Sequence, residues 1–278
     1  MIQQKDGDFI KIKVLMENTA ADAKFFCGHG LSVYIETADH KILMDAGPDR
    51  RFAFNAYRMG VNLADIDIVV LSHGHYDHSG GLIQFLELND SAMIYAASGY
   101  DRPHYNENGA YIGVDPAIID NPRIKVLDGD LQIDDSVLIT RFGGGNLAEP
   151  INTCGMTEGE MEATGRVVTY PECFEHEHYL LVSDGGKKVL FTGCSHKGIV
   201  NITEWAKELE PDVVFGGFHL MGVKEEDFGM LDRIAGELLL GGMDYYTGHC
   251  TGQAQYEHMK EIMKDRLNYA AAGCVIDI

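Results

Sequence analysis

Four side chains of metal-binding type crowd into residues 73–78, within the sequence Ser-His-Gly-His-Tyr-Asp-His-Ser-Gly-Gly (72–81). Imidazole and carboxylate are ligands for zinc, iron and manganese. In extended backbone, side chains two residues apart point to the same side, so His73 and His75 can converge on one ion. Asp77 and His78, at the start of a following helix, can face a second. A lone histidine is usually an ordinary core or surface residue, but this spacing predicts a metal site.

Two elements are expected to hold this cluster in place. Residues 67–71 form an apolar, β-branched run without polar alternation, which is typical of a strand buried on both faces. Helical spacing follows over residues 81–88. We expect Gly80 and Gly81 to let this helix lie close to the loop, where a side chain would hold it away.

The remaining pattern predicts an α+β fold. Expected strands are 11–15, 31–37, 41–45, 92–96, 123–127, 136–142, 179–183, 188–192, 212–215, 243–246 and 271–276. Expected helices are 49–59, 198–209, 225–240 and 253–265. Residues 98–121 and 143–173 are expected to be mostly loop, with Gly143 to Gly145 a turn or a lid hinge. Two strand-rich segments with helices favour an αββα sandwich, with two mixed sheets face to face, helices on both outer faces and a single domain over 1–278.

Composition excludes several classes of protein. The 278 residues include 43 Asp and Glu against 22 Lys and Arg, a net charge of −21. This excess of negative charge disfavours nucleic acid and anionic membranes as partners, leaving a small molecule. No export signal or membrane-spanning run is visible, and six dispersed cysteines are typical of reduced thiols. We therefore expect a cytoplasmic protein, of undetermined oligomeric state.

Several motifs together resemble one known family. The sequence at 73–78 is similar to the His-x-His-x-Asp-His signature of the metallo-β-lactamase superfamily, and Met44 to Gly47 resembles its upstream Asp-x-Gly turn. Further matches lie at 28–32, 191–196, 216–220 and 248–252. The most similar branch contains the dihydropterin synthase-like proteins of methanopterin biosynthesis. The resemblance implies an αββα fold, one or two divalent ions at the sheet edges, and hydrolysis by a metal-bound hydroxide.

The resemblance also implies roles for individual residues. His73 and His75 match the first-site pair of the family, and Asp77 and His78 match its second-site pair. His249 matches the final family histidine. Asp77 would also orient or relay a proton. Cys194 stands where most members place a bridging aspartate; as a thiolate it would favour zinc, with iron or manganese as alternatives, whereas a small buried apolar residue is an equally open interpretation.

The third ligand of the first site has no clean counterpart in the sequence. His196, two residues beyond Cys194, is the better donor if the thiol stays protonated; His176 and His178 are the other candidates. We interpret residues 175–178 as a solvated acidic run. His219, after an expected strand, is interpreted as a substrate contact, with a strand-capping role equally open. The remaining histidines are treated as ordinary and are His29, His40, His104 and His258.

Four functions are compatible with these patterns. The first is a metal-dependent hydrolase of a small anionic ester or phosphoester. The second, implied by the closest resemblance, is a transferase that joins a pterin methyl diphosphate to an aminobenzene ribosyl phosphate. A diiron oxidoreductase ranks lower because no flavin-binding extension is visible, and a non-catalytic ligand sensor is disfavoured by the intact histidine cluster.

Overall fold

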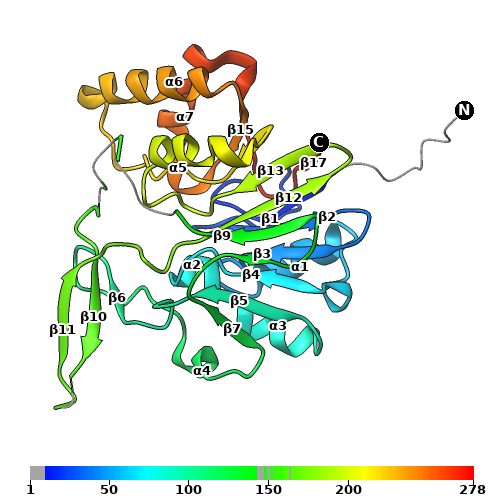
Figure 1. The fold of residues 1–278 in the computed structure, drawn as a ribbon, viewed down its shortest axis with the longest axis vertical. Coiled ribbons are helices and arrows are strands. Elements are labelled where there is room, and N and C mark those ends of the chain that lie inside the picture. Colours follow the sequence, from blue (N-terminus) through cyan, green and yellow to red (C-terminus); the bar gives the residue numbers. More distant parts are fainter. Residues whose placement is uncertain (1–9, 143–146, 149–150, 152, 163) are drawn as a thin grey trace, which may run out of the picture.

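Two seven-stranded sheets form the body of the protein in the computed structural model, which describes residues 10–142, 147–148, 151, 153–162 and 164–278 (Figure 1). The first sheet has the order β17-β1-β2-β3-β4-β5-β7. Its strands are β1 (Lys11–Met16), β2 (Ser32–Glu36), β3 (Lys41–Met44), β4 (Ile68–Val70), β5 (Met93–Ala97), β7 (Ile124–Leu127) and β17 (Val275–Asp277). The pairing is antiparallel from β17 to β3 and parallel from β3 to β7, so the sheet is mixed.

The second sheet has the order β16-β15-β14-β13-β12-β9-β8. Its strands are β8 (Leu131–Gln132), β9 (Val137–Thr140), β12 (Tyr179–Asp184), β13 (Lys187–Phe191), β14 (Val213–Phe215), β15 (Asp244–Thr247) and β16 (Leu267–Tyr269). The pairs β13–β14, β14–β15 and β15–β16 are parallel. The pairs β13–β12, β12–β9 and β9–β8 are antiparallel. The second sheet is therefore also mixed.

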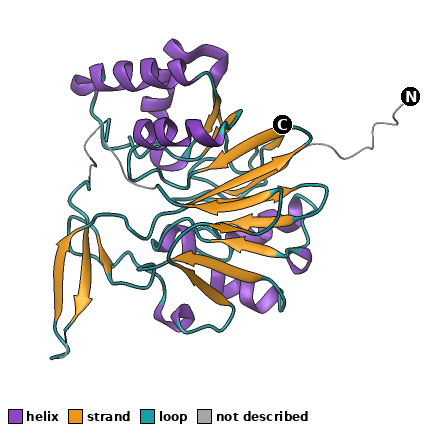
Figure 2. Ribbon diagram, viewed as in Figure 1, coloured by secondary structure: helices purple, strands orange, loops and turns teal. Residues whose placement is uncertain are grey.

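Apolar side chains cover both faces of each sheet. Between the sheets, Val33 and Val70 share one core with Val189 and Phe215. On the outer face of the first sheet lie α1 (Arg51–Arg58), α3 (Leu82–Leu88) and the short α4 (Pro116–Ile119). On the outer face of the second lie α5 (Ile199–Ala206), α6 (Gly229–Gly241) and α7 (Gln253–Met263). The predicted αββα sandwich is confirmed (Figure 2).

Both segments that we expected to be mostly loop contain regular structure. Strands β10 (Thr157–Met161) and β11 (Val167–Pro171) form a hairpin, and β6 (His104–Tyr105) pairs with β10. This three-stranded sheet projects from the sandwich (Figure 1). Strand β10 is mostly polar, but Val167, Val168 and Tyr170 of β11 are β-prone residues that our loop assignment overlooked. Gly143 to Gly145 lie outside the described residues.

The expected strand at 271–276 is also wrong in its bounds. The chain instead forms β16 in the second sheet and β17 in the first, with a turn at Gly273 (φ 92°) between them. The alanines at 270–272 are apolar but lack the β-branched side chains that favour strands. Among the described residues, no helix combines the length and hydropathy needed to cross a membrane.

Candidate metal centre

The carboxyl ends of parallel strands bring the candidate ligands together. Residues 73–78 follow β4 and run into the short helix α2 (Tyr76–Ser79), while Cys194 and His196 follow β13 and His249 follows β15. Strand β4 belongs to the first sheet and the other two strands belong to the second. The cluster therefore lies where the strand ends of the first sheet approach those of the second, as expected for a site at strand ends.

Close backbone packing allows this approach. A Cβ atom at Gly80 would lie 2.1 Å from the carbonyl oxygen of Pro48, and one at Gly81 would lie 2.1 Å from that of Ala46. Neither contact is possible, so these glycines do permit a close approach, but its partner is the turn at 46–48 that follows β3.

Asp45, immediately after β3, organises the loop from beneath. This fully buried residue has a left-handed backbone (φ 59°), and its carboxylate accepts hydrogen bonds from the Ser72 amide (2.8 Å) and hydroxyl (2.7 Å). The same carboxylate lies 2.6 Å from Nδ1 of His78. Because a carboxylate accepts hydrogen bonds, Nδ1 of His78 carries a proton and donates it to Asp45, and Nε2 is the atom that faces the cluster.

Two further histidines are held in the same tautomer. Nδ1 of His73 lies 2.9 Å from the Ser72 hydroxyl, which already donates to Asp45 and so accepts from His73. Nδ1 of His249 lies 2.8 Å from Oδ1 of Asn18, an oxygen that can only accept. In all three imidazoles Nδ1 donates to an outer partner, so Nε2 is the atom that faces the cluster.

The first set of facing ligand atoms comes from His73, His75 and His196. Nε2 of His73 lies 3.2 Å from Nε2 of His196, and all three side chains are buried. Phe174 stacks on the His196 ring at 4.3 Å between centroids. Glu177 fixes the backbone beneath it by accepting from the His196 amide at 2.7 Å. The structure therefore brings His196, and neither His176 nor His178, against His73.

The second set contains Asp77, His78 and His249. Nε2 of His78 lies 3.2 Å from Nε2 of His249, and Oδ2 of Asp77 lies 3.3 Å from the same His249 atom. The Cys194 sulfur lies 3.0 Å from Nε2 of His78, and Cys194 also groups with His73. Cys194 therefore stands between the two sets.

The donor chemistry fits divalent ions. Burial and the neighbouring imidazoles hold the pKa of His73 and of His196 well below the usual value, so both rings are neutral. Nδ1 of His196 is buried without a hydrogen-bond partner. Nitrogens at about 2.0–2.1 Å from a tetrahedral zinc are roughly 3.3 Å apart, close to the 3.2 Å found here. The facing Nε2 atoms of each pair are thus spaced as two ligands of one zinc ion.

Three sequence interpretations need correction. His176, Glu177 and His178 are buried, so residues 176–178 are not a solvated run. His104 is not ordinary, because it is fully buried and its Nδ1 lies 3.0 Å from Glu172. His29 lies at the site too, with Nε2 3.1 Å from Oδ2 of Asp77. Alternation of Glu and His at 175–178 was the available signal, whereas nothing near Glu172 in the sequence indicated its position.

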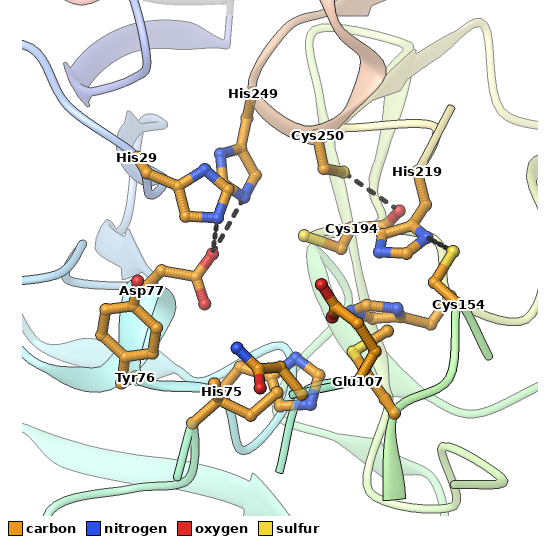
Figure 3. Close-up of a pocket in the computed structure, with 14 residues that line it drawn as sticks. His29, His75, Tyr76, Asp77, Glu107, Cys154, Cys194, His219, His249 and Cys250 are labelled. Atoms are coloured by element: carbon orange, nitrogen blue, oxygen red, sulfur yellow. Dashed lines mark hydrogen bonds and ion pairs between the residues drawn. The ribbon is translucent and has the colours of Figure 1, made fainter. Parts of the chain in front are cut away.

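A cavity of about 250 Å³ opens onto the cluster (Figure 3). It is lined by ligand candidates and by outer residues that include His29, Tyr76, Glu107, Cys154 and His219. The His219 ring lies 4.2 Å from that of His196, and its Nδ1 is 3.9 Å from the Cys154 sulfur. His219 is therefore at the wall of the cavity and outside both ligand sets. No lysine or arginine lines this cavity in the part of the chain that the structure describes.

Comparison with known proteins now gives the family. The family model of the metallo-β-lactamase superfamily matches residues 26–206. The chain belongs to this superfamily. A superfamily structure described as a metal-dependent hydrolase has 25% identity, a TM-score of 0.79, and coverage of 97% of this chain and 99% of that one. Zinc-bound PqqB of Methylobacterium extorquens, at 14% identity, a TM-score of 0.55 and coverage of 96% and 100%, shares the fold.

Two sequence relatives come from Methanocaldococcus jannaschii. One is an uncharacterized protein, 29% identical over 96% of this chain and 100% of its own. The other is 7,8-dihydropterin-6-methyl-4-(beta-D-ribofuranosyl)-aminobenzene-5'-phosphate synthase, 28% identical over 93% of each chain. These similarities agree with the branch of the superfamily that the sequence motifs indicated.

Proposed function

We propose that this superfamily member is a metal-dependent hydrolase of a small anionic ester or phosphoester. One observation carries the proposal: two buried sets of ligand atoms face each other with Cys194 between them. His73, His75 and His196 would hold one ion, and Asp77, His78 and His249 a second. The mixture of imidazole, carboxylate and thiolate favours zinc, with iron or manganese as alternatives.

The ions would supply the chemistry, and the protein would position it. A bound divalent ion lowers the pKa of a water from 15.7 to about 7 and polarises the bond to be broken. Asp77 is the proposed proton carrier, because its Oδ2 lies 3.1 Å from His29 and 3.3 Å from His249. The His29 side chain is half exposed (52%), so the pair Asp77–His29 leads from the buried centre to solvent (Figure 3).

The residues that line the cavity favour a substrate whose anionic group binds at the metal ions. Since no lysine or arginine is among the lining residues, the ions would be the source of positive charge. His219 would contact the substrate from the wall. Glu107 would disfavour a second negative charge further out, so the remainder of the substrate is expected to be uncharged or cationic.

A second candidate is a transferase that joins a pterin methyl diphosphate to an aminobenzene ribosyl phosphate. The relative named as an aminobenzene phosphate synthase favours it, because the alignment covers 93% of each chain. In that reaction the ions would stabilise the diphosphate leaving group.

Metal analysis, an activity panel and solvent isotope labelling test both candidates. Wild type and His75→Ala would be assayed for bound metal, with His258→Gln as a control on the exposed face of α7. We expect His75→Ala to lose metal and to lose activity on phosphoesters, thioesters or lactones. Hydrolysis incorporates ¹⁸O from labelled water into the product, whereas transfer does not. Metal near zero in wild type after reconstitution with zinc, manganese and iron would overturn both.

A further inference from the structure

Behind His75 lies a buried group that the proposed chemistry does not use. Oε1 of Glu172 is 3.0 Å from Nε2 of His75, 3.0 Å from Nδ1 of His104 and 2.6 Å from Nε2 of His176. All four side chains are at most 4% exposed. Three imidazoles around one carboxylate oxygen resemble a metal site in composition, so the protonation of each ring decides what the group does.

The state of His176 argues against a cation at this group. The Gly74 amide donates a hydrogen bond to Nδ1 of His176 at 2.8 Å, so that nitrogen carries no proton. A ring whose Nδ1 accepts a hydrogen bond carries its single proton on Nε2, and this atom faces Glu172. A metal at Nε2 would need that lone pair and would leave the ring without any proton. Nε2 of His176 is therefore a donor to Glu172.

The same carboxylate oxygen then fixes the tautomer of the His75 ring. We infer that Glu172 accepts the Nε2 proton of His75 and so turns the Nδ1 lone pair of that ring toward the proposed metal site. The hydrogen bond from Nε2 of His176 holds the Glu172 carboxylate in the position that this requires. Glu172 is thus a positioning residue. The inference rests on the proposed function only in taking a metal ion as the partner of Nδ1 of His75.

The hairpin β10–β11 supplies this carboxylate. Glu172 directly follows β11, and its amide donates to the Met156 carbonyl at 3.1 Å. His104 lies in β6 and pairs with Glu158 of β10. Residues near His75 are tied to the same unit, since the Tyr76 amide donates to the Ile112 carbonyl at 2.7 Å. The three-stranded sheet outside the sandwich therefore contacts the proposed metal site through the Glu172 side chain.

The test compares Glu172→Gln with the matched variant Glu158→Gln, which removes a nearly buried carboxylate (7% exposed) from the same hairpin. Zinc dissociation constants would be measured by chelator competition, and the cobalt-substituted proteins would be compared by absorption spectrum. We expect Glu172→Gln to bind zinc roughly 10–100-fold more weakly with unchanged stoichiometry and an altered cobalt spectrum. Glu158→Gln should leave both unchanged.

A second measurement keeps the inference testable without metal. In metal-free protein, ¹⁵N NMR of the imidazoles should show the His75 proton on Nε2 in wild type and in Glu172→Asp, which keeps the charge, and a mixture of tautomers in Glu172→Gln. Wild-type His75 protonated on Nδ1 would overturn the inference, as would an unchanged zinc constant in folded Glu172→Gln. Loss of one whole equivalent of metal would overturn it as well, because Glu172 would then be a ligand. Failure of wild type to bind any ion would instead overturn the proposed function.

Discussion

Nε2 of His73 lies 3.2 Å from Nε2 of His196, although the two residues are separated by 123 positions in the sequence. His73 follows β4 of the first sheet and His196 follows β13 of the second. An ion held by both would connect the two sheets directly. Binding of metal is therefore expected to raise the stability of the fold, because the site is complete only in the native state.

Replacing His196 tests this link. His196→Gln should weaken binding at the first set by more than the roughly 10–100-fold that changes outside the ligand shell cost. The zinc-induced rise in thermal midpoint should shrink in parallel. Calorimetry with and without zinc measures both quantities. His258→Gln, whose ring pairs with Asp232 on the surface, should behave as wild type, and an equal loss in this control would argue against a specific role.

Cys194 should release a proton when it binds metal. Burial, together with Cys250 and nearby carboxylates, raises the pKa of the thiol well above its usual value, so it is protonated at neutral pH without a cation. Only the thiolate is a good ligand, so zinc affinity should increase with pH more steeply in wild type than in Cys194→Ser.

Titration calorimetry in buffers of different ionisation enthalpy counts the protons. We expect about one proton fewer for Cys194→Ser, and no change for Cys274→Ser at a site remote from the cluster. Equal proton release in wild type and Cys194→Ser would mean that the thiol is a packing residue.

His40 should make folding stability depend on pH. Its ring lies 2.5 Å from Asp67 and 2.5 Å from Asp134. Burial lowers the pKa of His40, but the hydrogen bonds to Asp134 and Asp67 outweigh it and the net shift is upward. The protonated ring is therefore the stabilising form. Its contribution is fully present below the unfolded pKa of about 6.5 and is lost as pH rises through the higher folded value.

Denaturant unfolding across this range measures the effect. Because both carboxylates are about half exposed, we expect a loss of only about 1 kcal/mol in wild type. His40→Gln should be less stable at pH 6 and should lack that pH dependence. A variant with the same slope as wild type would contradict the assignment.

Two glycines should respond in opposite directions to alanine. Gly81→Ala places a Cβ 2.1 Å from the Ala46 carbonyl oxygen, so the start of α3 must move away from the turn that follows β3. Gly236 lies inside α6, and an added Cβ there meets nothing within 4 Å. We expect Gly236→Ala to gain about 0.5–1 kcal/mol, and Gly81→Ala to lose stability by more than that and to weaken zinc binding. Thermal unfolding of the two variants provides the comparison.

The sequence predicted the layers of the fold because their signals are local. The apolar runs around β4, β12 and β13 depend on neighbouring residues only, and the structure has strands at all three places. The β10–β11 hairpin was missed because neither strand shows the apolar alternation that we used, although Val167 to Tyr170 are β-prone residues.

Some residues of the candidate site could be predicted from local sequence, and others could not. Residues 73–78 are close in sequence, so their spacing alone indicated a cluster. Which histidine faces His73 depends on the turn after β13, where Ser195 has a left-handed backbone (φ 58°), and no periodic pattern encodes that turn. Glu172 is more distant still, since a carboxylate 97 residues from His75 reaches it only through a hairpin that the sequence did not reveal.

The course of the chain beyond β16 has a consequence for synthesis on the ribosome. Strand β1 pairs on one side with β2, which follows it closely, but on the other side with β17, made more than 250 residues later. Throughout elongation one edge of β1 therefore lacks its final neighbour, and such an edge can pair with other nascent chains. Closing that edge is expected to be a late event, after both sheets are largely assembled.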